Sequence, residues 1–323
     1  MKITENALNV LAALTYKGIG KAWIVKNIEG GDPLDQVFEL LNRGTKEQYS
    51  ISVNDFKNRK ENIRGRCEDL DESIDGVVGI GDSDFPPYRG VVKNSERPVV
   101  LFYRGNLALL QRQNAIATVI GLLNPDEVTE VSESAIVSEF VRNGVTILSG
   151  LALGCDSIAH KQTLISGGKT IAALPSPISD IIPAANRDLA EEIVQKEGLL
   201  ISEYLEAPKS KMQLTSRYIE RDRLQALFSD CVVLAASYAE NNAGNDSGAR
   251  HAMNYAASYS IPRAVMYDSE IHSRNPKYDL NRQLMNERGV VVIEGGNLQE
   301  LLKRIQSAHA IPSNDEWKQT NLF

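Results

Sequence analysis

The chain has 323 residues and a mass of 35.6 kDa, enough for roughly two domains of about 150 residues each. It carries 35 Lys and Arg against 42 Asp and Glu, so its net charge is −7 and its pI about 5.3. A surface covered in basic charge is therefore excluded, and a nucleic-acid partner would have to be held by a local basic patch.

The apolar stretches, the N-terminus and the cysteines indicate the cellular compartment and whether metals or disulfides are expected. The longest apolar stretches, such as 115–123, fall short of the roughly 18 residues that a membrane span needs. The N-terminus shows no secretory signal, and the three cysteines (Cys67, Cys155 and Cys231) form no close pair. We expect a cytoplasmic protein without membrane contact, disulfide, metal or cofactor.

The first part of the chain has the pattern of a small helical domain. Apolar residues recur at helical spacing from residue 4 to about 42. Within this region, 17–21 reads Lys-Gly-Ile-Gly-Lys, which suits either a phosphate-binding helix-hairpin-helix turn or a plain tight turn. The stretch 68–84 then has seven acidic and no basic residues, which indicates a linker. We predict a helical domain with its linker over 1–75, a larger domain over 76–306, and a polar tail over 307–323.

The larger domain alternates short apolar runs with helical stretches. The predicted strands are Val99–Tyr103, Ala115–Ile120, Thr146–Leu148, Thr170–Leu174, Gly198–Ile201, Cys231–Ala235, Arg263–Tyr267 and Val290–Ile293. Strands separated by helical crossovers predict an α/β fold with a doubly wound, mostly parallel, Rossmann-like sheet.

A glycine-containing turn follows the third of these strands. Ser149, Gly150 and Gly154 lead into a helix for which Asp156 could serve as the N-cap. Small residues before a helix N-terminus allow backbone N–H groups to approach an anion, so these four residues are candidate phosphate ligands. The segment matches neither a dinucleotide-binding fingerprint nor a Walker loop, and a merely tight turn is the alternative.

Two reactive side chains lie near this turn. His160 has no companion with metal-ligand spacing, which favours a packing or capping role. Cys155 adjoins a helix N-terminus, where a thiolate is favoured, but no base accompanies it. We therefore propose no catalytic residue and expect no enzyme.

A locally basic segment, 209–223, is the second candidate site. Its predicted ligands are Lys211, Arg217, Tyr218, Arg221 and Arg223. If the segment is helical, arginines four residues apart share a face and grip phosphates, and the tyrosine stacks on a base. The alternative is a solvated face whose charges pair internally, with Glu220 and Asp222 as partners.

Further candidates lie in loops after predicted strands. Ser247 and Gly248 belong to a loop of small polar residues over 239–248, and Asn186 follows Pro183 in another loop. Open α/β sheets bind ligands at the carboxyl ends of their strands, so these loops predict one shared edge. A flexible surface loop is the alternative for 239–248.

Several short motifs occur in a characteristic order. They are Gly79–Tyr88, Arg97–Leu107, Ser149–His160, Gly168–Ala172, Pro183 with Asn186, Ser202–Glu203, Arg221–Ser229, Ser247–Gly248 and Asn281–Leu284. Over about residues 76 to 300 this order resembles the DNA-processing protein A family, also called Smf, whose members bind single-stranded DNA. The resemblance implies a homodimer that protects single-stranded DNA and hands it to the RecA recombinase in transformation or a related process.

The chain departs from the family pattern at several points. Residues 121–125 read Gly-Leu-Leu-Asn-Pro where the family has Gly-Ser-Arg, so an expected phosphate-binding arginine is absent. Asp222 takes the place of an asparagine, 249–251 replaces a small-apolar-Thr run, and the chain leaves no room for a winged-helix domain. These changes indicate a divergent branch and leave open whether DNA binding has been retained.

A nucleotide-binding sensor or a nucleoside-monophosphate phosphoribohydrolase is the rival interpretation. Related Rossmann-like hydrolases carry Pro-Gly-Gly-x-Gly-Thr-x-x-Glu after a strand, and 241–248 contains no such run. Hydrolysis is therefore the weaker form of this alternative, and ligand sensing stays open.

Overall fold

The computed structural model describes residues 1–28, 34–47, 50–70, 72–240, 248–295 and 297–310. The strands are β1 (Lys2–Ile3), β2 (Gly76–Gly79), β3 (Val100–Gly105), β4 (Ile116–Ile120), β5 (Thr146–Ser149), β6 (Thr170–Ala173), β7 (Leu199–Ser202), β8 (Cys231–Leu234), β9 (Arg263–Met266) and β10 (Val290–Ile293). The α-helices are α1 (Glu5–Ala13), α2 (Lys21–Asn27), α3 (Leu34–Gly44), α4 (Val53–Glu68), α5 (Glu127–Arg142), α6 (Cys155–Ile165), α7 (Arg187–Gln195), α8 (Lys211–Leu227), α9 (Ala249–Ser258), α10 (Ser269–His272), α11 (Asp279–Leu284) and α12 (Gln299–Ala310).

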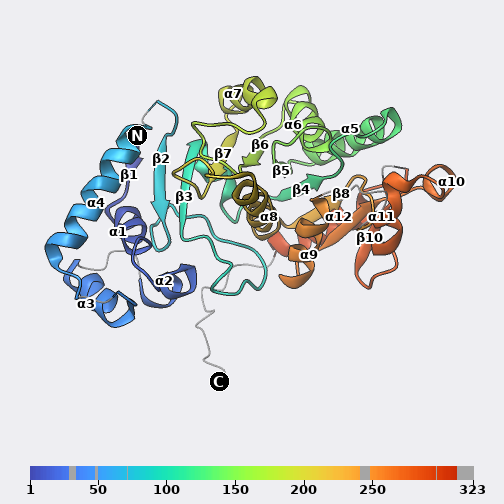
Figure 1. Cartoon of the computed structure of the whole chain (residues 1–323). Helices are drawn as coiled ribbons and strands as arrows, with labels where there is room; N and C mark the ends of the chain where they lie inside the picture. Colours follow the sequence, from blue (N-terminus) through green and yellow to red (C-terminus); the bar gives the residue numbers. More distant parts are fainter. Residues whose placement is uncertain (29–33, 48–49, 71, 241–247, 296, 311–323) are drawn as a thin grey trace.

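One ten-stranded sheet forms the centre of the molecule (Figure 1), in the order β1-β2-β3-β7-β6-β5-β4-β8-β9-β10. All pairings from β7 through β10 are parallel, whereas β3 is antiparallel to both of its neighbours. The doubly wound, mostly parallel sheet is thus confirmed. The eight predicted strands are present, with ends that differ by at most two residues, and β1 and β2 are additional.

The strand order reverses beside β4. The chain runs from β4 outward to β7, returns through α8, and continues from β8 to β10 on the other side of β4. In open α/β sheets, the carboxyl ends of the two strands that flank such a reversal are where ligands bind. The fold therefore directs attention to the ends of β4 and β8.

Helices cover both faces of the sheet. Leu224 of α8 and Met253 of α9 belong to a hydrophobic cluster on one face, and Phe140 of α5 and Leu301 of α12 belong to a cluster on the other. The central strands are consequently buried along their whole length, as in β4. This explains why they appear in the sequence as continuous apolar runs without alternation.

The N-terminal helices pack against the β1 edge of the sheet (Figure 1). Strand β1 pairs with β2, and a single hydrophobic cluster joins Leu8 of α1 and Phe56 of α4 to Phe102 of β3. The acidic stretch 68–84 contains β2, and within it Asp82 accepts a hydrogen bond from Thr4 Oγ1 at 2.6 Å. The domain boundary at residue 75 stays a prediction, and the packing across it is continuous.

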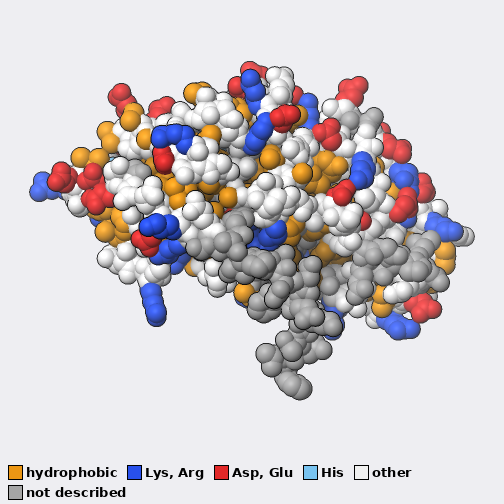
Figure 2. Space-filling model, turned by 180° about the vertical axis from the view of Figure 1, so that it is seen from behind, with side chains coloured by type: hydrophobic (Ala, Val, Ile, Leu, Met, Phe, Trp, Pro, Cys, Tyr) orange, Lys and Arg blue, Asp and Glu red, His pale blue; other side chains and the backbone are white. Residues whose placement is uncertain are grey.

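Charges of both signs are interspersed on the face shown in Figure 2. Lysine and arginine side chains there lie beside aspartate and glutamate and do not form one broad basic surface. Helix α12 continues past residue 306 to Ala310, and 311–323 lie outside the described residues. In the part of the chain that the structure describes, no helix is both long and apolar enough to cross a membrane.

Candidate nucleic-acid interface

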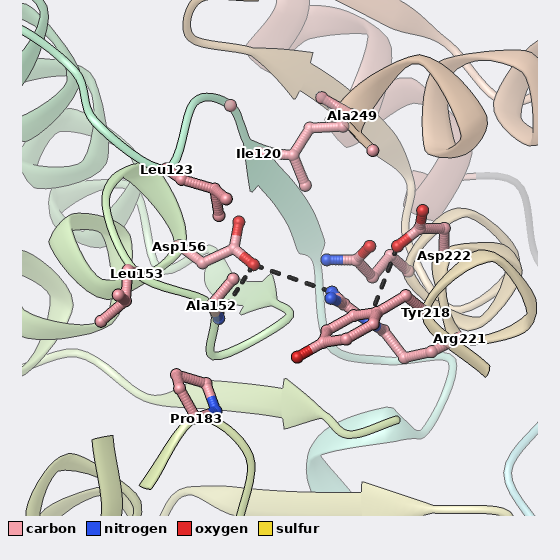
Figure 3. A pocket seen from close by; sticks show the side chains of 13 residues that line it. Ile120, Leu123, Ala152, Leu153, Asp156, Pro183, Tyr218, Arg221, Asp222 and Ala249 are labelled. Carbon is pink, nitrogen blue, oxygen red and sulfur yellow. Dashed lines mark hydrogen bonds and ion pairs between the residues drawn. The ribbon is translucent and has the colours of Figure 1, made fainter. Parts of the chain in front are cut away.

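A cavity of about 380 Å³ opens at the end of β4, at the reversal of strand order (Figure 3). Its apolar walls include Ile120, Leu123, Leu153, Pro183, Tyr218 and Ala249. Its polar lining consists of Asp156 from α6 and of Arg221, Asp222 and Gln225 from α8. Mostly apolar walls with a few convergent polar groups are typical of small-molecule sites.

Asp156 does not cap α6. The helix begins one residue earlier, at Cys155, with Gly154 as its N-cap, so Asp156 lies in the first turn. Its Oδ2 accepts a hydrogen bond from the Ala152 N–H at 3.2 Å. Burial raises the pKa of this carboxyl, and Arg221 and the neighbouring backbone N–H groups oppose the rise. A side-chain carboxylate therefore already occupies part of the turn that was predicted to hold a phosphate.

The small residues of this turn are explained by packing. A Cβ on Gly150 would lie 1.4 Å from Arg221 Nη1, so the guanidinium rests directly against this glycine. Gly154 has a φ of +74°, a conformation that side chains rarely adopt. Ser149 is fully buried, and its hydroxyl donates to the Val119 carbonyl at 2.7 Å. Phosphate binding by these three residues stays a prediction.

The arginines of α8 are buried, which corrects the expectation that they form a basic surface patch. Arg217, Arg221 and Arg223 are 8%, 5% and 3% exposed. Only Arg221 lines the cavity, where its Nη1 lies 3.7 Å from Asp156 Oδ2 and its Nε 3.6 Å from Asp222 Oδ1. Figure 3 shows this guanidinium between the two carboxylates.

The other predicted residues of α8 lie away from the cavity or at its wall. Arg217 donates to the Glu206 carbonyl at 2.7 Å and stacks on Tyr204, and Arg223 pairs with Glu203. Residues 221 and 223, two apart on a helix, cannot share a face. Lys211 is exposed at the start of α8, whereas half-buried Tyr218 lines the cavity.

Of the residues predicted in loops, one lines the cavity, one is buried elsewhere, and one is not described. Gly248 lines the cavity, and Ser247 lies outside the described residues. Asn186 is buried, and its Nδ2 donates to the Leu151 carbonyl at 2.8 Å and to Ser157 Oγ at 2.9 Å. This amide thus braces the glycine turn. The cavity brings together four of the twelve predicted ligands: Asp156, Tyr218, Arg221 and Gly248.

His160 and Cys155 are both buried. His160 is fully buried, its Nδ1 lies 2.7 Å from Thr170 Oγ1, and burial lowers its pKa to about 3, with Arg221 adding to the effect. This agrees with the predicted packing role. Burial raises the pKa of the Cys155 thiol well above its usual range, so the helix N-terminus does not produce a thiolate there.

The segment 121–125, in which the sequence departs from the family pattern, forms part of the cavity wall. Leu122 is buried, and its carbonyl accepts a hydrogen bond from the Cys155 N–H at 2.9 Å. Leu123 is 64% exposed and lines the cavity. The segment in which the family pattern predicts an arginine therefore supplies an apolar wall.

The cavity has little positive charge. Arg221 is its single cation among the described lining residues, against two carboxyl groups, Asp156 and Asp222. Burial raises the pKa of Asp222 to about 7, with Arg221 opposing the rise and Asp156 adding to it. A phosphate would meet no net positive charge in this cavity, and its desolvation would go uncompensated.

Sequence reasoning missed several lining residues. Leu153, Pro183 and Gln225 were not predicted as ligands or walls. Gln225 follows Arg221 by four residues, so helical spacing alone would have placed it on the same side of α8. Leu153 and Pro183 come from loops, and their positions depend on tertiary packing.

Comparison with known proteins identifies the family. The family model described as DNA recombination-mediator protein A matches residues 76–302. Protein Smf of Synechocystis is 34% identical over 155 residues, which cover 47% of this chain and 37% of that protein. The DNA processing protein DprA of Streptococcus pneumoniae is 35% identical over 109 residues, which cover 34% of this chain and 37% of that protein. The matches thus span less than two fifths of these relatives.

Two solved structures of DprA proteins have a fold similar to that of this chain. The X-ray structure of DprA from Streptococcus pneumoniae superposes with a TM-score of 0.67 at 23% identity, covering 93% of this chain and 98% of that chain. DprA from Helicobacter pylori, whose structure describes its single-stranded DNA binding mode, has a TM-score of 0.54 at 25% identity and covers 69% of this chain and 98% of its own. The chain belongs to the DNA recombination-mediator protein A family.

Proposed function

We propose that this chain binds single-stranded DNA and seats one base in the cavity beside α8, with the phosphates outside. The observation that carries the proposal is the cavity itself, which lies at the ligand-binding edge of a family domain. The related protein from Helicobacter pylori, whose structure describes a single-stranded DNA binding mode, supports the choice of ligand.

A base suits the cavity better than a phosphate does. The walls are mostly apolar, and Tyr218 offers an aromatic ring on which a base can stack. The polar groups are one arginine, two carboxyl groups and the amide of Gln225. All of them can bond to a neutral heterocycle, whereas the two carboxyl groups repel a phosphate anion. The phosphates would then contact exposed cations such as Lys211 at the start of α8.

The wider role follows from family membership. We infer that the protein acts by binding, without catalysis, in DNA processing or recombination in the cytoplasm. In this role it would protect single strands and pass them to a RecA recombinase as a homodimer. Light scattering of the free protein, and filament assembly by RecA with and without it, would test the two partner assignments.

The proposal is tested with a fluorescently labelled single-stranded oligonucleotide. We expect binding that weakens steeply with salt, since phosphate contacts release counterions. Tyr218→Ala removes the stacking surface and should weaken binding by about 1–3 kcal/mol. Arg221 lies over the Tyr218 ring at 5.6 Å from its centroid. Tyr88→Ala is the matched control, because Tyr88 lies under Arg97 at 4.9 Å in the same way but does not line the cavity.

A free nucleotide is the alternative ligand, favoured by the partly enclosed shape of the site. Thermal-shift measurements with mononucleotides and cyclic nucleotides separate the two functions. Stabilisation by one nucleotide, together with no oligonucleotide binding at low salt, would contradict the proposal and favour a sensor.

A further inference from the structure

We infer that the cavity prefers guanine and that Asp222 and Gln225 recognise the Watson–Crick edge of this base. The inference rests on the proposed function, because it assumes that a nucleobase enters the cavity. The specificity for the base is assigned to the cavity wall that α8 forms, where polar atoms lack hydrogen-bond partners among the described residues.

Polar atoms on this wall have unused bonding capacity. The Asp222 side chain is 8% exposed, and within the described residues its one close charged partner is Arg221 Nε at 3.6 Å, beyond hydrogen-bond length. Gln225 is 1% exposed, and its Nε2 has no hydrogen-bond partner in the described part of the chain. Arg221 Nε is likewise buried without a hydrogen-bond partner among the described residues. An unpaired buried polar group costs about 1–3 kcal/mol, so these two nitrogens beside a cavity indicate a ligand.

The two side chains are placed to act together. Asp222 and Gln225 are three residues apart on α8, so they are neighbours on one face of the helix. Tyr218 lies one turn before Asp222 on the same wall, and Figure 3 shows both at the cavity beside Arg221. A base stacked on Tyr218 would present its polar edge to Asp222 and Gln225.

Asp156 is less available to a ligand than Asp222 is. Its Oδ2 accepts the Ala152 N–H at 3.2 Å and lies 3.7 Å from Arg221 Nη1. Among the described residues, Asp222 has no equivalent hydrogen bond from a backbone donor, and a Cβ built on Gly248 would lie 3.7 Å from its Oδ2. Discrimination between bases is therefore expected from Asp222.

Guanine matches this wall best. Its Watson–Crick edge presents the O6 acceptor followed by two adjacent donors, N1–H and N2–H. A carboxylate accepts both donors at once, and the amide of Gln225 donates to O6. Adenine and cytosine offer one amino donor next to an acceptor, and thymine places a carbonyl on each side of its single N–H. Each of these bases would leave a carboxylate oxygen unpaired or opposite a carbonyl.

The test compares short oligothymidylates that carry one central dG, dA, dC or dT. We expect the dG oligonucleotide to bind about tenfold tighter or more than the all-dT strand, since a bidentate contact discriminates by about 1–3 kcal/mol. Asp222→Asn replaces an acceptor oxygen by an NH₂ group and should abolish this preference. Gln225→Met keeps the size of the side chain, removes the donor to O6, and should reduce the preference.

Glu220→Gln is the matched control, because it removes one carboxylate from the exposed part of the same helix. It should retain the full preference for dG. Circular dichroism and thermal unfolding of all three variants show whether each one is folded before its binding is compared.

A second arm measures the stabilisation of wild type and Asp222→Asn by dGMP, dAMP, dCMP and dTMP. Equal binding of all four oligonucleotides would overturn the guanine preference and leave the proposed function intact. Stabilisation by dGMP that Asp222→Asn abolishes, without oligonucleotide binding, would support the preference and contradict the proposed function. No binding in either arm overturns both.

Discussion

The side chain of Asp222 is buried in an environment that disfavours its charged form. Its side chain is 8% exposed, and Arg221, its one cationic neighbour among the described residues, also faces Asp156. Burial raises the pKa of Asp222 to about 7 for this reason. A buried charged residue of this kind lowers the stability of the folded state. Such residues are typical of binding sites, where they are kept because they contribute to function.

This arrangement predicts how stability changes with pH. Folding raises the pKa of Asp222 from 3.8 to about 7, so between these values the folded state holds a proton that the unfolded chain has released. The contribution of this group to the free energy of unfolding is therefore largest below about pH 4 and falls until about pH 7. Asp222→Asn cannot ionise and should be more stable than wild type by about 2–4 kcal/mol above pH 7, but not near pH 4. Urea unfolding across this pH range measures the difference, and parallel pH profiles would contradict the assignment.

Gly150 and Arg221 illustrate what the sequence does and does not reveal about single residues. The glycine turn was recognised from its composition, and its position after a strand is correct. The reason for Gly150 is the guanidinium of Arg221, 71 residues later in the chain, which would lie 1.4 Å from a Cβ there. Such a contact depends on tertiary packing and leaves no local signal.

At the scale of elements, most of the sheet was predictable from the sequence. Strands that are buried on both faces form continuous apolar runs, and β4 to β8 were found for this reason. Strand β1 has two residues and β2 reads Gly-Val-Val-Gly, so neither carries a distinct pattern. Both depend on pairing between the N-terminus and a segment more than 70 residues away.

The burial of α8 was not predictable from its composition. Charged residues are usually exposed, so five basic residues over 209–223 indicate a surface patch. The partners that allow burial, Glu203 for Arg223 and Asp156 for Arg221, lie on other elements. The segment that was predicted to bind DNA by surface charge therefore contributes a cavity wall.

Helix α11 joins the ends of two strands through Asn281. This side chain is fully buried, accepts a hydrogen bond from the Ser237 N–H at 3.1 Å, and donates to carbonyls at the ends of β8 and β9, including Met266 at 2.8 Å. Asn281→Ala leaves these groups buried and unpaired, and we expect a loss of about 2–4 kcal/mol in the free energy of unfolding. Chemical denaturation measures this loss.

Asn286→Ala is the control for this prediction. Asn286 is exposed and donates to the carbonyl of Arg282 at 2.9 Å, so the change should stay within about 0.5 kcal/mol. Similar losses for the two variants would show that the strand ends do not depend on Asn281.

At the scale of the whole molecule, the N-terminal helices are joined to the sheet by charge as well as by apolar packing. Lys21 Nζ of α2 lies 3.1 Å from Glu203 Oε1, and Glu203 also pairs with Arg223 of α8. Lys21 belongs to the Gly-Ile-Gly hairpin that was considered for phosphate binding, and that binding stays a prediction. In the structure this lysine contacts the domain that holds the cavity.

The continuity of packing predicts that the N-terminal helices and the sheet unfold together. The hydrophobic cluster that includes Leu8, Phe56 and Phe102 crosses the predicted boundary at residue 75, and separating the two parts would expose apolar surface on both. Scanning calorimetry of the full chain should therefore show one transition, with equal calorimetric and van't Hoff enthalpies. Glu203→Gln should move this transition to lower temperature without splitting it, because Arg223 would stay buried without a carboxylate partner. Two separate transitions in the wild type would instead show that residues 1–75 fold independently of the sheet.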